Sequence, residues 1–178
     1  MKKAVGIIAE YNPFHKGHAY HIEKAKELTG ADYAVVVLSG DFVQRGTPAV
    51  FSKHLRTKMA LLGGADVVLE LPSYYASSSA EYFAKGSIGI LNALHGIDFL
   101  CFGSESGELS PCMATAEILS KEPEAFRFLK RKPEKGLSSL SPQSCTLRIR
   151  RKIPSGPWNN EFLDTPNNIL GVEYCKAL

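Results

Sequence analysis

The sequence AVGIIAEYNPFHKGH occupies residues 4–18 and opens with six apolar residues, several of them β-branched. Such a run is typical of a strand buried on both faces of a parallel sheet. Pro13 ends this pattern, because proline cannot donate a ladder hydrogen bond. A helix with one apolar face is expected over residues 17–28, and Gly30 can end it in the left-handed conformation. The stretch therefore predicts a strand, a polar loop and a helix in succession.

The same unit recurs further along the chain. Apolar runs predict strands at 33–38, 66–71 and 98–102, and helices are expected at 52–62 (after Ser52 as N-cap) and 78–94. Strands that alternate with helices predict an α/β fold, an open parallel sheet with flanking helices. Beyond residue 110 we expect helices at 111–119, 123–131 and 167–177, with irregular chain at 132–166. The predicted organisation is one domain over 1–110 and a small helical and irregular region over 111–178.

The composition is that of an ordinary globular protein. The 178 residues are 44% hydrophobic and 22% charged, which excludes wholesale disorder. No apolar run approaches the length of a membrane span, and the first residues lack the pattern of a signal peptide. We therefore expect a cytoplasmic protein with no membrane association. Cysteines stand at 101, 112, 145 and 175 without C-x-x-C spacing, so reduced thiols are expected.

The positive charge of the chain is concentrated in one segment. Residues 127–152 hold nine Lys and Arg against a single acidic residue, Glu134. A solvated connector between structured parts would have this composition. A surface that contacts the phosphates of a nucleic acid would have it too. The charge pattern alone does not choose between these two interpretations.

Polar loops follow three of the predicted strands, at residues 12–18, 39–46 and 103–105. Ligands of open parallel sheets bind outside the carboxyl ends of the strands. Because parallel strands end at the same edge, we expect the three loops to converge on one rim.

The first loop carries the residues with the clearest chemistry. His15 and His18 are three apart at a helix start, so both side chains can face the same side. A helix N-terminus presents free N–H groups and binds anions, and two imidazoles add further donors. Gly17 allows close approach to the backbone. This combination indicates a nucleoside triphosphate handled at its α-phosphate, and the sequence has neither a P-loop motif nor a G-x-G-x-x-G after the first strand.

Two other interpretations of these histidines exist. The first is a solvated helix face without a ligand. The second is a metal site made of His15, His18 and His21. No cysteine or carboxylate cluster completes a four-ligand set in the sequence, so we do not expect zinc.

The H-x-G-H of residues 15–18 resembles the signature of the adenylyltransferase and class I aminoacyl-tRNA synthetase superfamily. Five motifs in order are more specifically similar to the bacterial tRNA(Met) cytidine acetate ligases: EYNPFHKGH at 10–18, SGDFVQRG at 39–46, ELP at 70–72, FGSE at 102–105 and PNNILG at 166–171. The resemblance runs from residue 3 to about 130 and resumes at 164–178.

This resemblance implies a Rossmann-like nucleotidyltransferase fold and a two-step reaction. Acetate attacks the α-phosphate of ATP, accompanied by Mg²⁺, to give acetyl-adenylate and pyrophosphate. The N4 amine of the wobble cytidine of elongator tRNA(Met) then takes the acetyl group and AMP leaves, with no acetyl-enzyme. His15 and His18 would be catalytic. The residues implied to contact ATP are Ile8, Ala9, Glu10, Tyr11, Asn12, Pro13, Phe14, His15, Lys16, Gly17, His18, Ala19, Tyr20, His21, Gly103 and Asn167.

Two alternatives stand beside this function. Members of the family continue past the match at 164–178 and carry there a further arginine that contacts ATP, for which this sequence has no counterpart. An inactive short form that only binds nucleotide or RNA is therefore one alternative. The other is a small-molecule nucleotidyltransferase, but the late Ser-Ser/Thr-x-x-Arg motif of those enzymes is absent, since no arginine follows residues 103–106.

Overall fold

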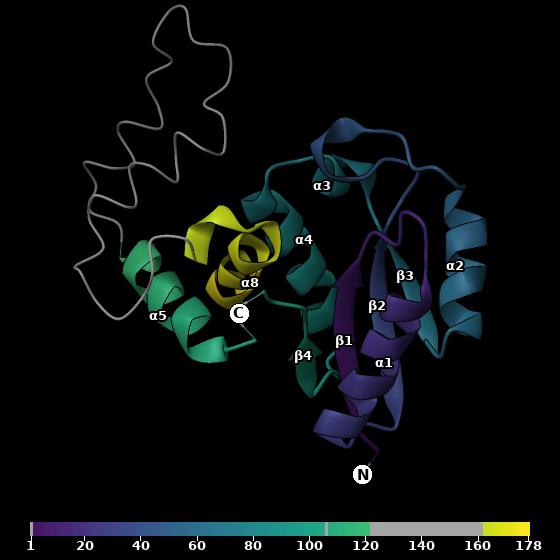
Figure 1. Cartoon of the computed structure of the whole chain (residues 1–178), viewed down its shortest axis with the longest axis horizontal. Coiled ribbons are helices and arrows are strands. Elements are labelled where there is room, and N and C mark those ends of the chain that lie inside the picture. Colours follow the sequence, from purple (N-terminus) through teal and green to yellow (C-terminus); the bar gives the residue numbers. More distant parts are fainter. Residues whose placement is uncertain (1, 106, 122–161) are drawn as a thin grey trace, which may run out of the picture. The chain divides into compact units, whose positions relative to one another are not determined.

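The computed structural model describes residues 2–105, 107–121 and 162–178 (Figure 1). The chain divides into two compact units, one of residues 1–103 with 177–178 and one of residues 104–176. The helix expected at 123–131, most of the irregular segment and the basic segment 127–152 lie outside the described residues.

The first unit is built on four parallel strands in the order β3-β2-β1-β4 (Figure 1). β1 is paired on both sides, with β2 in the register Ile7↔Val36 and with β4 in the register Ile7↔Cys101. The strands are β1 (Ala4–Ala9), β2 (Tyr33–Ser39), β3 (Val67–Leu71) and β4 (Phe99–Cys101). The predicted open parallel sheet is confirmed, and each strand lies where the apolar runs predicted it.

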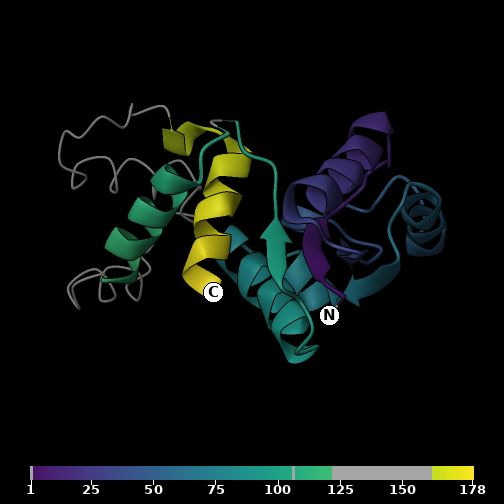
Figure 2. The same cartoon turned by 90° about the horizontal axis from the view of Figure 1, so that it is seen from below.

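The helices of the first unit lie on both faces of the sheet (Figure 2). They are α1 (Lys16–Thr29), α2 (Lys53–Leu62), α3 (Ser73–Ala76) and α4 (Ala80–Ala93), with a short 3-10 helix at Gln44–Gly46. The helix predicted at 78–94 is confirmed as α4, which begins two residues later, and the short helix α3 before it was not predicted. Ser77 donates a hydrogen bond to the carbonyl oxygen of Ser73 at 2.6 Å, and Ser78 donates to that of Tyr74. Serine side chains that bond back in this way favour the end of a helical turn.

The two faces of β1 pack against different helices because side chains alternate along a strand. Ile7 lies fully buried in one core with Ile22 of α1 and Ala60 of α2. Gly6 faces the other way, and a Cβ atom added there would lie 2.8 Å from Cδ1 of Leu91 in α4. The missing side chain therefore lets α4 lie close to the central strand.

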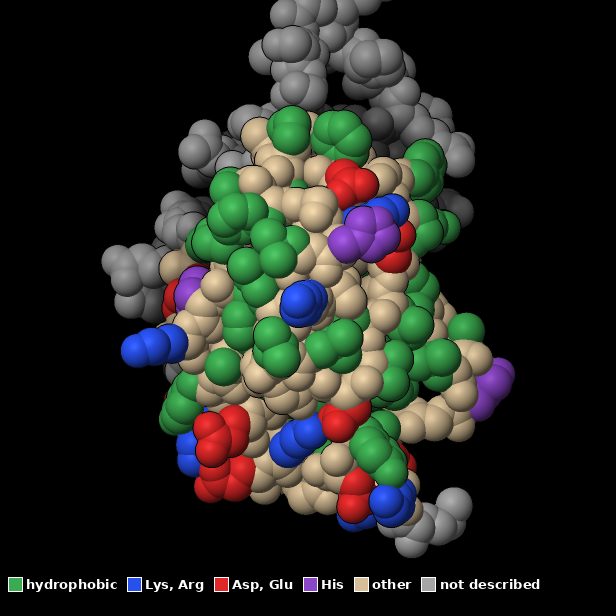
Figure 3. Space-filling view, turned by 90° about the vertical axis from the view of Figure 1, so that its right-hand side faces the viewer, with side chains coloured by type: hydrophobic (Ala, Val, Ile, Leu, Met, Phe, Trp, Pro, Cys, Tyr) green, Lys and Arg blue, Asp and Glu red, His purple; other side chains and the backbone are tan. Residues whose placement is uncertain are grey.

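The outward side of α2 stays in contact with solvent. Leu55, Leu61 and Leu62 are exposed there, and hydrophobic side chains are scattered among charged ones over this face (Figure 3). Apolar residues of α2 therefore lie on its exposed side as well as on its buried side, unlike those of a helix with a single apolar face.

One arrangement of aspartates is repeated at the amino-terminal edge of the sheet. Asp32, Asp66 and Asp98 each stand directly before a strand. Each donates its N–H to a carbonyl oxygen of the neighbouring strand's start, at 2.9 Å in every case. Each carboxylate then accepts the N–H of that same residue, at 2.8, 2.7 and 2.8 Å. The paired residues are Lys3, Ala34 and Ala4, so these three reciprocal pairs fix the register of all three strand contacts.

The second unit contains α5 (Leu109–Ser120), a 3-10 helix at Phe162–Asp164, and α8 (Pro166–Ala177). The helices predicted at 111–119 and 167–177 are confirmed, each beginning one or two residues earlier. The prediction of irregular structure through residue 166 is wrong at its end, where the 3-10 helix and the start of α8 lie. Among the residues described, no helix is long and apolar enough to cross a bilayer. Cys101, Cys112 and Cys175 are free thiols.

We expect Asp66 to make the protein sensitive to acid. Burial raises the pKa of this carboxyl, but the hydrogen bonds from Lys26 and from the N–H of Ala34 outweigh burial and hold the pKa below its ordinary 3.8. The unfolded chain then binds the proton more readily than the folded one, so stability falls as pH drops through the folded pKa. Asp66→Asn should be less stable than the parent near neutral pH. This difference should shrink towards about pH 3 in urea unfolding, and an equal difference at both pH values would contradict the role of the charge.

Candidate active site

The first turn of α1 is capped by two histidines. Nδ1 of His15, the N-cap residue, accepts a hydrogen bond from the N–H of Gly17 at 3.1 Å. Nδ1 of His18 accepts one from the N–H of His15 at 3.2 Å, which completes a reciprocal capping box. The two rings stack with centroids 3.6 Å apart. The structure thus brings both residues of the H-x-G-H motif to one side of the helix start.

These hydrogen bonds decide where the protons of the two imidazoles lie. A ring nitrogen that accepts a hydrogen bond carries no proton, so the proton of each neutral ring is on Nε2. Burial, followed by the nearby His15 and His21, lowers the pKa of His18 from 6.5 to about 4. At neutral pH His18 is therefore an uncharged donor through Nε2–H. His15 is exposed at the same helix end.

Gly17 lies close to the ring of His15. A Cβ atom added there would lie 3.0 Å from Cε1 and 3.1 Å from Nδ1 of His15. We expected Gly17 to leave room for a ligand, and the structure shows that the space beside it borders the His15 ring. A larger residue at this position would displace the imidazole.

The loops that follow β1 and β2 meet at the carboxyl edge of the sheet, as predicted. Oε1 of Glu10 accepts a hydrogen bond from the N–H of Gln44 at 2.6 Å. Oδ1 of Asn12 accepts one from the N–H of Val50 at 2.7 Å. Glu10 and Asn12 thus connect the first loop to the second. The family resemblance implied that both residues contact ATP, but it did not indicate this connecting role.

Aromatic side chains pack the first loop against the start of α1 and the end of α2. Tyr11 is buried with a φ of 47°, a left-handed conformation unusual for a residue with a side chain. Its ring lies 4.8 Å, centroid to centroid, from those of both Phe14 and His18. Phe14 also fills the space beside Gly63 at the end of α2, where an added Cβ atom would be 2.3 Å from Cζ. The peptide bond between Asn12 and Pro13 is cis.

His21 lies one turn beyond His18 and contacts a cysteine. Its Nε2 is 3.4 Å from Sγ of Cys101, at the end of β4. Burial lowers the pKa of His21 and raises that of Cys101, so the pair consists of a neutral imidazole and a neutral thiol. The sequence did not suggest this contact, because the two residues are 80 positions apart. A neutral thiol is a poor nucleophile.

The other predicted site residues fall into two groups. Ile8 and Ala9 end β1, while Lys16, Ala19 and Tyr20 lie on the first turns of α1. Lys16 and Tyr20 are exposed beside the histidine cap. The structure therefore places the whole segment from Ile8 to His21 around the start of α1.

Gly103 and Asn167 belong to different units. Gly103 ends the continuous segment 1–103 of the first unit, and a Cβ atom added to it would meet nothing within 4 Å. Asn167 lies in the first turn of α8 in the second unit. Its N–H and Nδ2 donate to Oε1 of Glu105 at 3.3 and 3.0 Å, and the N–H of Asn168 donates to Oε2 at 3.0 Å. Glu105, the last residue of the FGSE motif, therefore contacts the PNN motif inside the second unit.

Carboxylates at the carboxyl edge are engaged with the protein itself. Glu70 at the end of β3 forms an ion pair with Nζ of Lys53 at 2.8 Å, and Oδ1 of Asp41 accepts the N–H of Lys53 at 3.1 Å. Within the described ranges, no group of three or more His, Cys, Asp or Glu side chains could hold a metal ion. Mg²⁺ retains several waters and is usually held by one or two carboxylates together with phosphate oxygens.

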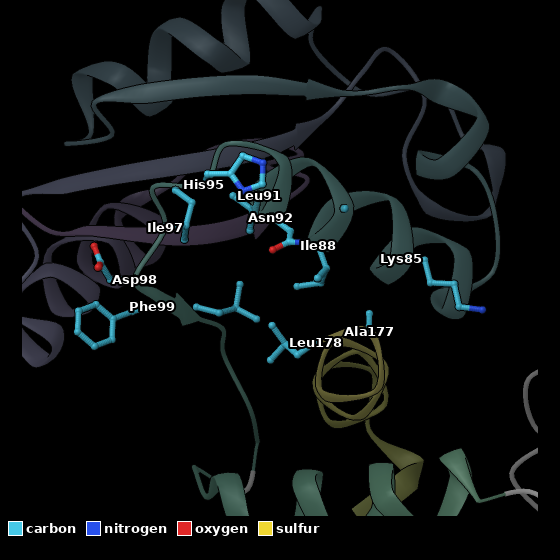
Figure 4. Close-up of a pocket in the computed structure, with 12 residues that line it drawn as sticks. Lys85, Ile88, Leu91, Asn92, His95, Ile97, Asp98, Phe99, Ala177 and Leu178 are labelled. Carbon is cyan, nitrogen blue, oxygen red and sulfur yellow. The ribbon is translucent and has the colours of Figure 1, made fainter.

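A cavity of about 280 Å³ lies elsewhere in the first unit (Figure 4). It is bordered by Ile88 and Leu91 of α4, by His95 and Asp98 before β4, and by Leu178. None of the predicted ATP-site residues lines it. Its position at the start of β4 is opposite the edge where the loops of the histidine cap emerge.

The family model described as HIGH Nucleotidyl Transferase matches residues 1–178. The chain is 48% identical over 178 residues to the tRNA(Met) cytidine acetate ligase of Acetivibrio thermocellus, covering 99% of this chain and 42% of that protein. It is 52% identical over 175 residues to that of Caldicellulosiruptor saccharolyticus, covering 98% of this chain and 42% of that protein.

A solved structure shares the fold. It is the crystal structure of Thermotoga maritima TmcAL bound with alpha-thio ATP, which superposes with a TM-score of 0.83 at 40% identity. That match covers 98% of this chain and 43% of the other. The chain thus spans less than half the length of these relatives, while the family model covers every residue. The chain belongs to the HIGH Nucleotidyl Transferase family.

Proposed function

We propose that this chain binds ATP at the start of α1 and uses it to activate acetate for transfer to a cytidine of tRNA(Met). The stacked pair His15 and His18 carries the proposal, because both Nδ1 atoms are used by the cap and both Nε2–H groups are left to donate. The names of the relatives and the ATP analogue bound to the Thermotoga maritima protein support it. Such a reaction would take place in the cytoplasm, where tRNA and ATP are found.

In the first step, a carboxylate oxygen of acetate attacks the α-phosphorus of ATP. The bond from this phosphorus to the bridging oxygen breaks, giving acetyl-adenylate and pyrophosphate. Negative charge builds on the phosphoryl oxygens in the transition state. The Nε2–H donors of His15 and His18 and the free N–H groups of the first turn of α1 would stabilise this charge, and Mg²⁺ bound to the phosphates would neutralise part of it.

In the second step, the N4 amine of the cytidine attacks the acetyl carbonyl carbon. The bond to the phosphate oxygen breaks, AMP leaves and the amine loses one proton. No side-chain nucleophile takes part in this scheme. The neutral Cys101–His21 pair agrees with it, because burial disfavours the thiolate that an acetyl-enzyme would require.

Acetate-dependent pyrophosphate release tests the proposed reaction. We expect the chain to release pyrophosphate from ATP only when acetate is present. Release that depends on a phosphorylated metabolite instead would favour a small-molecule nucleotidyltransferase. ATP binding without any release would favour a nucleotide-binding short form, and absence of ATP binding would contradict the proposed site.

Variants of the two histidines can separate capping from catalysis. His15→Asn retains an N-cap acceptor, and His18→Gln retains the acceptor of a capping box, but both lose the Nε2–H donor. We expect each variant to unfold near the parent temperature. Acetyl-adenylate formation should fall by on the order of 10²–10³, the effect of losing one transition-state donor.

His54 provides a matched control, because it is an exposed histidine on α2 that takes no part in the hydrogen bonds of the histidine cap. His54→Asn should retain the parent rate. If His15→Asn and His18→Gln both retained it as well, the assignment of the donors would be wrong.

Binding of tRNA should depend on the basic segment at 127–152, which lies outside the described residues. Phosphate contacts make the affinity fall with salt, by roughly 0.7–0.9 in log–log slope for each phosphate neutralised. Replacing Arg148, Arg150 and Arg151 with Ser should therefore lower affinity and salt slope equally for cognate and non-cognate tRNA. A filter-binding titration at several salt concentrations measures both quantities.

Replacing the exposed Lys2, Lys58 and Lys121 with Ser removes the same charge elsewhere and should leave the slope unchanged. Tight, salt-insensitive binding selective for tRNA(Met) would place recognition in the first 130 residues instead. The cytidine itself must leave its stack to reach the histidine cap, at a cost of a few kcal/mol in unstacking.

A further inference from the structure

Arg56 of α2 is a fully buried arginine, with 0% of its surface exposed. Among the ion pairs of the described residues, none involves its guanidinium. The group donates instead to backbone carbonyl oxygens, from Nε to Phe51 at 3.0 Å, from Nη1 to Glu10 at 2.6 Å and from Nη2 to Gly40. A buried charge is costly unless its hydrogen bonds are satisfied, so this side chain needs all three acceptors.

The three acceptors of Arg56 belong to three separate segments of the chain. Glu10 is the first residue after β1, and Gly40 is the first residue after β2. Phe51 precedes Ser52, the N-cap of α2. One guanidinium therefore joins the carboxyl ends of two adjacent strands to the start of a helix.

Side chains of the first loop make a second connection between the same segments. Glu10 takes part in both connections, because its carbonyl accepts from Arg56 while its carboxylate accepts from the N–H of Gln44. Asn12 adds a bond to the N–H of Val50. Only two residues separate Asn12 from His15, the histidine that caps α1. The second loop is thus connected to the histidine cap through a short segment of chain that several hydrogen bonds hold in place.

Arginine suits this place for a chemical reason. Its planar group carries five N–H donors in fixed directions, whereas a lysine ammonium has a single centre and cannot reach three separated carbonyls. Burial lowers the pKa of Arg56, while the carboxylates of Asp41, Glu10 and Glu70 act in the opposite direction. The guanidinium remains charged, because arginine does not lose its proton in proteins.

We propose that Arg56 is a positioning residue for the nucleotide site: it holds the loop before His15 against the loop after β2, and so sets where the histidine cap stands. For the nucleotide itself, this rests on the proposed function. Arg56 acts through the backbone of Glu10 and touches no substrate.

Hydrogen exchange tests the positioning without any nucleotide. The N–H groups of Gln44 and Val50 report the connection between the loops, because Glu10 and Asn12 are their acceptors. In Arg56→Lys, which keeps the charge, we expect both amides to exchange about tenfold faster or more. Lys58→Met is the matched control, since Lys58 is an exposed cation on the same helix, and it should leave both amides unchanged. Exchange in Arg56→Lys equal to that of the parent would overturn the proposal.

ATP affinity and chemical rescue provide a second test of the role of Arg56. Arg56→Lys should bind ATP about tenfold more weakly than the parent while its circular dichroism remains native, and Lys58→Met should bind as the parent does. In Arg56→Ala, added guanidinium ion at millimolar concentration should restore part of the affinity, and equal potassium chloride should not. A folded Arg56→Lys with parental ATP affinity would overturn the proposal. If Arg56→Ala does not fold, the affinity of Arg56→Lys alone decides this second test.

Failure of the proposed function has a different signature. If the parent did not bind ATP at all, the nucleotide assignment would fail for every variant. The exchange of the Gln44 and Val50 amides would still decide whether Arg56 holds the two loops together.

Discussion

The pairing of β1 with a parallel strand on each side is the contact on which the rest of the first unit depends. Parallel pairing sends every strand end of one kind to one edge. The amino-terminal edge is held by the aspartates that precede β2, β3 and β4, each in a reciprocal pair with its neighbour. The carboxyl edge is thereby left to loops that need not hold the sheet together. The contacts that set the register therefore lie at one end of the strands, and the loops of the candidate site lie at the other end.

The carboxyl edge still requires order, and polar contacts between backbone and side chains supply it. Arg56, Glu10 and Asn12 bond to backbone groups of neighbouring segments. Phe14 adds an aromatic contact with the glycine that ends α2. Loops have few apolar contacts of their own, so they rely on such bonds to adopt a single conformation. The position of the histidine cap depends on this network of contacts.

Much of this architecture could be predicted from the sequence. Continuous apolar runs indicated β1 to β4, and the spacing of His15 and His18 indicated a shared side. The short helix α3 was missed, and serine side chains that bond back to its carbonyl oxygens mark its end. Arg56 was missed for another reason: an arginine on a helix with polar neighbours usually lies at the surface, and its burial depends on carbonyls that are distant in sequence.

The role of Gly17 was also beyond pattern analysis. A glycine between two histidines fits a close ligand and a close imidazole equally well, and only the distance to the His15 ring shows the second. The Cys101–His21 contact, the Glu105 contacts of α8 and the connection made by Asn12 likewise join residues with no local signal. Sequence periodicity reports which residues are buried, whereas these contacts depend on which loops become neighbours.

The aspartate pairs have a consequence for how such a chain can change in length. Asp66 follows Asp32 by 34 residues, and Asp98 follows Asp66 by 32. Each interval is one complete crossover from the start of one strand to the start of the next. Because an aspartate anchors both ends of an interval, residues gained or lost within a strand or beside an anchor would shift a pair out of register. Insertions and deletions can be accommodated in the loops at the opposite edge, so lineages that diverge in length should differ around the candidate site before they differ in the sheet.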